Sequence, residues 1–374
     1  MSDDLAERVR GALATVRDPA LDGDVVSLGM VEEVRAPGGA VSVAIRLTTS
    51  ACPRRREFER DVREALAAVD GVKSVAVRFT SDTAWRKEHP APNATRLGSV
   101  KNCIAIASGK GGVGKSTVAA NLALALRDEG ARVGLMDADV YGPSQPLMFG
   151  VQGRQPKVSG GDKIEPIEAH GIRILSMGNL VEEGRSVVWR GPMIHKALAQ
   201  FFDDVLWGDL DYLLVDLPPG TGDAQLSLSQ LVPLVGAAVV TTPQEVSLID
   251  VRKSVDMFRR VRVPILGVVE NMSTFVCPSC QTETAIFDRG GGERAAKEWK
   301  VPLLGAIQID PSIRAAGDSG VPVVMSHPES PAAAAFRRAA RALACRVSVE
   351  VLTVRPPEPI PMARTQQPQA GFEV

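Results

Sequence analysis

The sequence has few cysteines, almost no net charge and no long apolar run. Five cysteines among 374 residues are too few for a disulfide framework, and their odd number leaves at least one unpaired. The 43 Lys and Arg residues nearly balance the 44 Asp and Glu residues, which argues against a general nucleic-acid binder. The longest apolar run, 231–240, is too short to span a bilayer and contains Pro233. We therefore expect a soluble cytoplasmic protein that binds neither nucleic acid nor a membrane.

The pattern along the chain predicts two domains. Residues 1–80 alternate between helical and strand periodicity, with one strand expected over 25–34, and indicate a small α+β domain. Residues 81–99 are polar and aperiodic, so we expect a linker. Residues 100–348 form the larger predicted domain. A proline-rich, aperiodic stretch follows, and we expect 349–374 to be a disordered tail.

The larger predicted domain has the pattern of an α/β protein. Short apolar runs recur, separated by segments that are mostly long enough for a helix. Such runs are typical of a parallel sheet with helices on both faces. The runs are Cys103–Ala107, Val133–Met136, Ile172–Ser176, Tyr212–Val215, Ala237–Val240, Ile265–Val269 and Leu303–Ile307.

A phosphate-binding loop follows the first of these runs. The segment matches G-x-x-x-x-G-K-[ST], with a strand before it and a helical pattern after it. Glycines let backbone N–H groups approach phosphates, and the helix N-terminus adds positive potential. We expect Lys115 to hold the β- and γ-phosphates of ATP and the Ser116 hydroxyl to bind Mg²⁺. The loop consists of Gly109, Lys110, Gly111, Gly112, Val113, Gly114, Lys115, Ser116 and Thr117.

Acidic residues end two further predicted strands. Asp137 and Asp139 lie at the end of one, and Asp216 lies at the end of another, with Asp223 a little later. Carboxyl ends of parallel strands face the ligand crevice, so Asp216 is in the position to hold the Mg²⁺ shell. Each acid taken singly is equally compatible with a helix N-cap.

Lys110 makes this loop resemble a particular class of ATPases. The segment K-G-G-V-G-K-S is similar to the deviant Walker A motif of nitrogenase iron protein, the Min and Par ATPases and the Mrp/ApbC proteins. That resemblance implies a homodimer in which Lys110 reaches the partner's nucleotide and neutralises charge on the transferred phosphoryl group. The alternative is a solvated surface lysine. The resemblance also gives Asp139 the role of orienting the attacking water, and Gly220 the role of sensing the γ-phosphate.

A single C-x-x-C motif, Cys277 to Cys280, allows three interpretations. A disulfide oxidoreductase would need a helix directly after the first cysteine, and little helix signal follows. Mononuclear zinc within one chain would need four ligands, and no second cysteine pair or histidine pair accompanies this one. A site shared by two chains would have four thiolates, which suits a [4Fe–4S] cluster or zinc.

The larger domain as a whole resembles the Mrp/ApbC family of iron–sulfur cluster carrier ATPases. The sequence segments that carry this resemblance are the loop with Lys110, residues 137–144, residues 216–223, and residues 270–273 followed by the cysteine pair. The resemblance implies that Asn271 contacts adenine and that Cys277 and Cys280 bridge a [4Fe–4S] cluster between two protomers. It also implies ATP hydrolysis and transfer of the cluster to apo iron–sulfur proteins. Asp288 departs from the family, which often has glycine there.

Residues 1–80 are similar to a small domain of iron–sulfur assembly factors. Three sequence segments carry the resemblance: Asp18-Pro19, residues 28–31 and residues 47–53. Cys52 precedes a predicted helix start beside three arginines, which favours its thiolate, although an inert half-buried cysteine is equally compatible. We expect assembly factors among the partners.

The sequence therefore predicts a homodimeric ATPase that carries an iron–sulfur cluster. One alternative is a positioning ATPase of the Min/Par type, and the neutral charge argues against the DNA-binding surface that it would use. A second alternative keeps the fold and makes the cysteine site structural zinc in a scaffold or chaperone.

Overall fold

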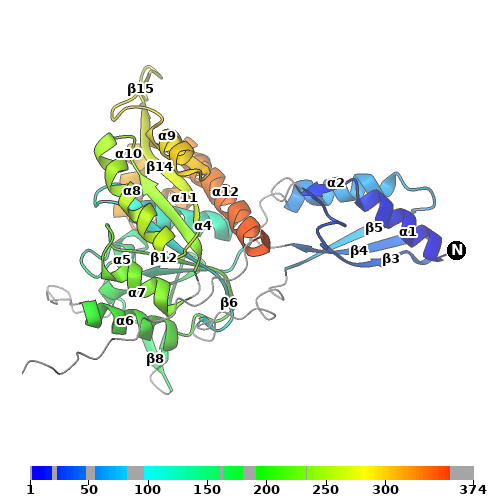
Figure 1. Ribbon diagram of the computed structural model, residues 1–374, viewed down its shortest axis with the longest axis horizontal. Helices are drawn as coiled ribbons and strands as arrows, with labels where there is room; N and C mark the ends of the chain where they lie inside the picture. Colours follow the sequence, from blue (N-terminus) through cyan, green and yellow to red (C-terminus); the bar gives the residue numbers. More distant parts are fainter. Residues whose placement is uncertain are drawn as a thin grey trace, which may run out of the picture.

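The computed structural model describes residues 2–18, 23–47, 55–81, 97–160, 163–179, 191–232 and 234–353. Figure 1 shows two bodies, a small one built from the elements between Ser2 and Ser81 and a larger one built from the elements between Val100 and Thr353. The predicted linker falls largely on residues 82–96, which lie outside the described residues. Among the helices of the described part, none is long and apolar enough to cross a membrane.

The small body is a three-stranded sheet covered by two helices. Its sheet has the order β3-β4-β5, antiparallel between β3 and β4 and parallel between β4 and β5. Apolar side chains of both helices and of the sheet make a core of its own. The elements are α1 (Ser2–Leu13), β1 (Arg17–Asp18), β2 (Gly23–Asp24), β3 (Val31–Arg35), η1 (Pro37–Gly39), β4 (Ala40–Leu47), α2 (Arg55–Ala67) and β5 (Ser74–Ser81).

The strand expected over 25–34 is wrong in its first half. The Asp24 carboxylate accepts hydrogen bonds from the backbone N–H groups of Val26 and Ser27, at 2.9 and 2.8 Å, and so holds a turn there. Gly29 then adopts a φ of 65°, which ends the turn before β3 begins at Val31. Asx turns of this kind compete with extended structure.

The larger body is a nine-stranded sheet, and the predicted α/β class is confirmed. The strand order is β10-β11-β7-β12-β6-β13-β14-β15, with β16 also paired to β14. The neighbours are parallel except for β10 and β15. The strands are β6 (Val100–Ser108), β7 (Val133–Asp137), β10 (Ile167–Ala169), β11 (Ile172–Ser176), β12 (Leu210–Asp216), β13 (Leu234–Thr241), β14 (Ile265–Val276), β15 (Glu283–Thr284) and β16 (Leu303–Ile309). A separate hairpin pairs β8 (Lys157–Ser159) with β9 (Lys163–Glu165).

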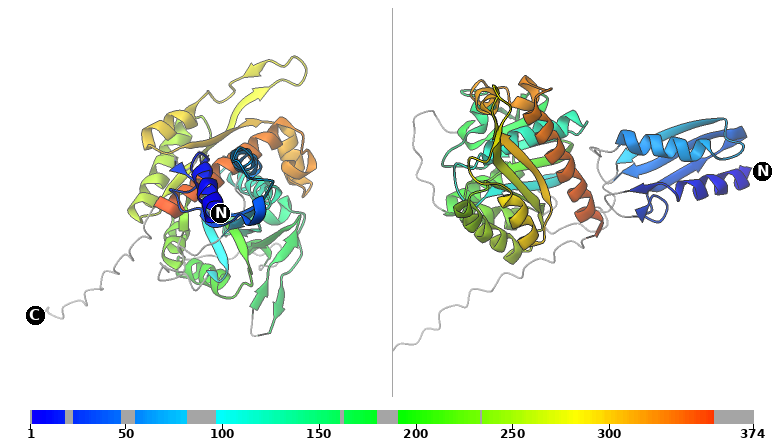
Figure 2. Two further views of the ribbon diagram at one scale, coloured as in Figure 1. Left: turned by 90° about the vertical axis from the view of Figure 1, so that its right-hand side faces the viewer. Right: turned by 90° about the horizontal axis from the view of Figure 1, so that it is seen from above.

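Helices cover both faces of this sheet. Side chains alternate along β6, so that Ile104 packs in one core with α4 and α12 while Cys103 packs in the other with α6, α7 and α8. Figure 2 shows α12, in orange-red, lying along one side of the larger body. The helices are α4 (Lys115–Asp128), α5 (Gln145–Met148), η3 (Met177–Asn179), α6 (Gly191–Asp203), α7 (Asp223–Leu231), α8 (Glu245–Arg260), α9 (Gly291–Trp299), α10 (Pro311–Asp318), α11 (Val323–Ser326) and α12 (Pro331–Thr353).

The last helix runs further than expected. A disordered tail was predicted from residue 349, but α12 continues to Thr353. Val347 and Ser348 are buried there, and Arg346 forms an ion pair with Glu350 one turn later. Burial of this turn stabilises helix where composition alone indicates none. Residues 354–374 lie outside the described residues.

Candidate nucleotide site and cysteine hairpin

The phosphate loop connects β6 to α4, where the sequence predicts it. Two of its glycines are required by close approach: a Cβ on Gly109 would lie 2.3 Å from the backbone of Asp250, and a Cβ on Gly114 would lie 2.3 Å from Nδ2 of Asn271. Gly114 also has a φ of 78° at the start of α4. The Asn271 amide donates a hydrogen bond to the carbonyl of Val113 at 2.9 Å. Strand β14 therefore braces the loop from the side.

A buried cation joins the loop to the carboxyl end of β12. The ammonium of Lys115 forms an ion pair with Oδ1 of Asp216 and lies 3.2 Å from Oγ of Ser116. The Lys115 side chain is 6% exposed and Asp216 is fully buried. A positive charge thus lies within reach of two oxygen atoms that the sequence assigns to Mg²⁺. Hydroxyl and carboxylate oxygens are hard ligands, so this donor set fits that metal.

Gln145 is a buried member of this cluster that the sequence reasoning missed. Its side-chain Nε2 donates to Oδ2 of Asp216 at 2.8 Å and to the carbonyl of Ser116 at 3.0 Å. Its backbone N–H donates to Oδ2 of Asp137 at 3.1 Å. A glutamine after Pro143-Ser144 carries no sequence signal for this role, because the contacts come from three separate segments.

Asp137 lies inside the same cluster, fully buried. Its carboxylate also accepts from the hydroxyl of Ser176, at 2.9 Å, and from the backbone N–H of Asp139. Burial, and then the negative charge of Asp216, raise the pKa of Asp137 to about 7. Lys115 is the ion-pair partner that the structure gives to Asp216, so the cluster holds two carboxyl groups beside one ammonium.

Asp139 and Gly220, the predicted switch residues, lie on the segments after β7 and β12. Oδ1 of Asp139 accepts from the backbone N–H groups of Tyr141 and Gly142, each at 3.2 Å. The N–H of Gly220, whose φ is 95°, donates to the carbonyl of Ser108 at 2.9 Å. Their predicted roles stay predictions. The hydrogen bond of Gly220 places its segment next to the phosphate loop, because Ser108 directly precedes Gly109.

The surface beside the loop carries a lysine and exposed apolar side chains. Lys110 is half-buried, and its ammonium has no hydrogen-bond or ion-pair partner within the described residues. Helix α8, whose residues 250 and 251 contact Gly109, exposes Val246 and Ile249 by 65% and 55%. Exposed apolar groups at such a place mark a surface suited to another protein.

The two cysteines of the C-x-x-C motif lie in a turn between β14 and β15. The backbone N–H of Cys277 donates to the carbonyl of Thr282 at 3.0 Å, and the N–H of Gln281 donates to the carbonyl of Cys277 at 2.9 Å. Cys277 is half-buried and Cys280 is exposed, and both are free thiols. Figure 1 shows this end of the larger body projecting at β15.

The thiol of Cys280 is prepared for deprotonation. Its Sγ lies 3.3 Å from the hydroxyl of Thr282. That hydrogen bond first, then the Thr282 backbone and the Cys277 thiol, lower the pKa of Cys280 below its ordinary value. Thiolate is the form that binds metals. Throughout the described ranges, no group of three or more His, Cys, Asp or Glu side chains lies close enough together to hold a metal ion, and the role of Cys277 and Cys280 as ligands stays a prediction.

Strand β14 connects the phosphate loop directly with the turn that contains the two cysteines. Asn271, which braces the loop, and Cys277, which begins the turn, are six residues apart, or about 20 Å along a strand. Between them Met272 has a φ of 56°, and the pairing with β16 shifts register between Asn271 and Phe275. A left-handed non-glycine residue within a strand marks a local irregularity that its surroundings hold in place.

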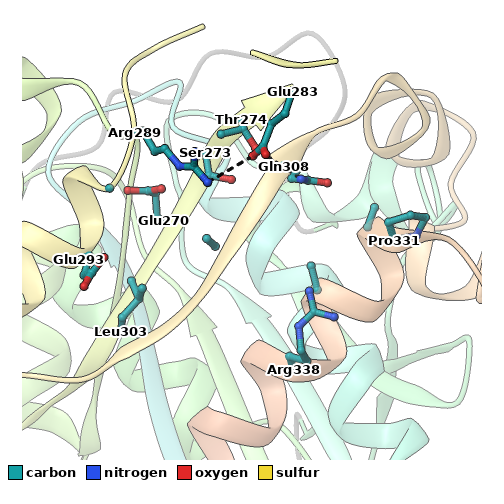
Figure 3. A pocket seen from close by; sticks show the side chains of 14 residues that line it. Glu270, Ser273, Thr274, Glu283, Arg289, Glu293, Leu303, Gln308, Pro331 and Arg338 are labelled. Carbon is teal, nitrogen blue, oxygen red and sulfur yellow. Dashed lines mark hydrogen bonds and ion pairs between the residues drawn. The ribbon is translucent and has the colours of Figure 1, made fainter. Parts of the chain in front are cut away.

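A separate cavity of about 380 Å³ lies beside β14, lined by residues of β15, β16, α9 and α12. Figure 3 shows Arg289 next to Glu283 at one side, Glu270 below them, and Arg338 on the opposite helix. Burial raises the pKa of Glu270, whose carboxylate accepts from the N–H of Gly292 at the start of α9. No residue of the phosphate loop lines this cavity, so it is distinct from the nucleotide site.

Two further sequence expectations have different outcomes. Asp288, expected to depart from a glycine of the resembling family, adopts a φ of 83°, a conformation that glycine reaches without cost. Cys52 lies outside the described residues, so its role stays a prediction.

Known proteins resemble both bodies. The family described as NUBPL iron-transfer P-loop NTPase matches residues 99–344, and the iron–sulfur cluster assembly protein family matches residues 6–79. The iron–sulfur cluster carrier protein of Deinococcus radiodurans is 51% identical over 346 residues, covering 92% of this chain and 96% of the relative. The iron–sulfur cluster carrier protein of Escherichia coli K12 is 41% identical over 343 residues, covering 92% of each.

Solved structures resemble the larger body. A nucleotide-binding protein from Archaeoglobus fulgidus in complex with ADP is 39% identical, with a TM-score of 0.54, and covers 60% of this chain and 89% of that one. The cell division ATPase MinD of Pyrococcus furiosus is 28% identical, with a TM-score of 0.51, and covers 65% of this chain and 98% of that one. The phosphate loop therefore lies in a fold that binds nucleotide in a similar protein.

Proposed function

The chain belongs to the NUBPL iron-transfer P-loop NTPase family, and on this premise we propose that it is an ATP-dependent iron–sulfur cluster carrier. It receives a cluster, holds it, and transfers it to apo iron–sulfur proteins. Relatives at 51% and 41% identity over 92% of the chain are named for this activity. The cluster is the cargo of the protein, while ATP is its substrate.

The pair of free thiols in the turn between β14 and β15 is the observation that carries this proposal. Cys277 and Cys280 supply two sulfur ligands, and the described part of the chain adds no third. Four thiolates suit a [4Fe–4S] cluster, so we infer that a second copy of the chain completes the site. An exposed cluster held by two ligands from each side is also accessible to an acceptor protein.

The surface around the phosphate loop supports a homodimer. Lys110 is half-buried and its ammonium has no partner among the described residues, and Val246 and Ile249 are exposed on the neighbouring helix. We infer that the partner covers these apolar side chains and that Lys110 meets the partner's phosphates. Its charge would then stabilise the transferring phosphoryl group.

ATP binding would redistribute the buried charges. The ammonium of Lys115 now pairs with Asp216, and the β- and γ-phosphates would compete for it. Ser116 and Asp216 would hold Mg²⁺, which supplies positive charge to the β- and γ-phosphates when bound. Asp216 thereby exchanges one cationic partner for another.

The switch residues would act on the γ-phosphate and the attacking water. Oδ1 of Asp139 is occupied by two backbone N–H groups, so its other oxygen is the one that can orient water. The N–H of Gly220 would have to leave the carbonyl of Ser108 to contact a γ-phosphate. Nucleotide state would thus move the segment that begins α7.

Strand β14 is the structural route by which nucleotide state reaches the cargo. Asn271, the predicted adenine contact, donates to the carbonyl of Val113 in the loop, and Cys277 follows on the same strand. A change at the loop that shifts Asn271 would shift the thiol pair. We propose that hydrolysis of ATP is coupled in this way to loading or release of the cluster.

The small body is assigned to contact with assembly factors. It matches the iron–sulfur cluster assembly family over residues 6–79. We propose 1–80 and 100–353 as the bounds of the two domains, the second ending with α12, and Cys52 as a transient thiol contact.

Anaerobic reconstitution with iron and sulfide tests the cargo site. The wild-type chain is expected to gain the brown absorbance of a [4Fe–4S] cluster, with about four iron atoms per two chains. Cys277→Ala/Cys280→Ala should lose it, while Cys345→Ala, a matched cysteine change in α12, should keep it. Retention of the same chromophore by the double variant would contradict the shared site.

The alternatives predict different results. Zinc without iron in a native preparation would favour a structural site in a scaffold protein. Co-sedimentation with DNA or with lipid vesicles would favour a positioning ATPase of the Min/Par type, whose fold this chain shares.

A further inference from the structure

Gln145 joins three parts of the nucleotide site. Its Nε2 donates to Oδ2 of Asp216 at 2.8 Å and to the carbonyl of Ser116 at 3.0 Å, and its backbone N–H donates to Asp137. The side chain is fully buried, so water does not compete for these contacts. Gln145 also begins α5, directly after the segment that contains Asp139. It therefore connects that segment with the loop and with the carboxyl end of β12.

The chemistry of its neighbours fixes the orientation of the amide. Oδ2 of Asp216 and the carbonyl of Ser116 are both acceptors, so the NH₂ group must face them. The opposite orientation would bring three oxygen atoms together. As a consequence, Oε1 of Gln145 is buried without a hydrogen-bond partner among the described residues. An unsatisfied buried acceptor destabilises the protein unless a donor arrives when the site is loaded.

The two oxygens of Asp216 have different partners. Lys115 holds Oδ1 and Gln145 holds Oδ2. When phosphates draw the ammonium away, Oδ1 loses its partner while Oδ2 stays fixed by the amide. The carboxylate then keeps its orientation, with Oδ1 directed toward the place beside Ser116 that the ammonium has left.

We propose that Gln145 is a positioning residue for Mg²⁺, holding Asp216 so that its free oxygen and the Ser116 hydroxyl bind the ion together. This inference rests on the proposed function, because it assumes that Mg²⁺ and ATP bind at this loop. Partners in the outer shell of a metal site commonly change metal affinity by about 10- to 100-fold.

The test measures Mg²⁺ through nucleotide binding and needs no turnover. A fluorescent ATP analogue is titrated with the dimeric protein in EDTA and then at increasing Mg²⁺. Gln145→Met has nearly the same volume and no hydrogen-bonding amide. We expect its half-saturating Mg²⁺ concentration to rise about 10-fold. Its affinity for the analogue in EDTA should stay within about twofold of wild type.

A matched control separates positioning from stability. Asn179 is another buried amide whose Nδ2 donates to two carbonyls, those of Val151 and Arg154, and whose Oδ1 has no partner in the described part of the chain. Asn179→Leu should lower the melting temperature without changing the Mg²⁺ requirement. Gln145→Asn keeps an amide on a shorter side chain, so we expect a smaller rise in the half-saturating Mg²⁺ concentration. This variant replaces Gln145→Met in the test if the methionine variant does not fold.

Two outcomes overturn the inference. An unchanged Mg²⁺ requirement in both Gln145 variants would show that the residue only packs. An equal loss of affinity in EDTA and in Mg²⁺ would show that it supports the loop and not the ion. Failure of the wild-type chain to bind the analogue at all would instead contradict the proposed function.

Discussion

Strand β14 leads from the nucleotide site, around Lys115 and Asp216, to the turn that holds Cys277 and Cys280. The two places differ in burial and in the number of segments that contribute to them. Asn271 contacts the phosphate loop, whose Lys115 is buried in an ion pair with the buried Asp216 at the end of β12. Cys280, nine residues later, is exposed, and its side-chain hydrogen-bond partners, Thr282 and Cys277, lie in its own turn. On the proposed function, one chain assembles the core of the nucleotide site, while it supplies half of the cargo site. A ligand to be released is better held where few contacts must break.

Breaking the buried ion pair should have the largest effect. Lys115→Met leaves the fully buried carboxylate of Asp216 without its cation, which costs about 3–5 kcal/mol of unfolding free energy. ATP hydrolysis should fall below detection. Chemical denaturation and a phosphate-release assay measure the two effects.

The double variant Lys115→Met/Asp216→Asn is the control for that experiment. Removing both charges should restore much of the stability and none of the activity, because a neutral amide needs no cation. If the single variant is as stable as wild type, the ion pair between Lys115 and Asp216 does not contribute to the stability of the nucleotide site.

The second largest effect is expected for Lys110→Ala, which tests whether the nucleotide site is complete in one chain. Lys110→Ala should lower kcat for ATP hydrolysis by about 10³-fold, since a cation supplied across an interface stabilises the transferring phosphoryl group. Binding of a fluorescent ATP analogue should change only a few-fold. Lys163→Ala, which removes a partly exposed lysine paired with Asp204, should leave kcat unchanged. Equal rates for both variants would mean that Lys110 has no partner to reach.

The buried acids of the nucleotide site should give it a pH dependence. The pKa of Asp137 is raised from 3.8 to about 7, so the folded state binds a proton more tightly than the unfolded chain does. Stability from this group is therefore full at low pH and is lost as pH rises from about 4 to about 7. We expect Asp137→Asn to remove this contribution to the slope of unfolding free energy against pH.

Comparison of slopes, measured by denaturation in the nucleotide-free protein, is the appropriate readout for Asp137→Asn. The amide also places a donor opposite the N–H of Gln145, which lowers stability at every pH. A variant with the wild-type slope would contradict the raised pKa.

How much of the structure the sequence could predict depends on whether a feature arises from local patterns or from contacts between distant segments. The phosphate loop, the strands around it and the acids at their ends follow from local patterns, so the fold class and the placement of Lys115 and Asp216 were predictable. Gln145 was not, because its partners Asp137, Ser116 and Asp216 come together only in the folded sheet. The start of β3 and the end of α12 were misplaced for related reasons. A side chain, Asp24, holds the turn before β3, and tertiary burial extends α12.

The smallest predicted effect concerns the exposed site. Thr282→Val removes the hydroxyl that does most to lower the pKa of the Cys280 thiol, so that pKa should rise and the thiolate fraction at pH 7 should fall. The rate of alkylation by iodoacetamide should drop a few-fold at pH 7 and converge with wild type at high pH. Thr284→Val, on the paired strand β15, is the matched control and should leave the rate unchanged. Because the turn has few other contacts, both variants should keep wild-type stability and ATP binding. A loss of ATP binding in Thr282→Val alone would show instead that the turn and the phosphate loop are coupled even without cargo.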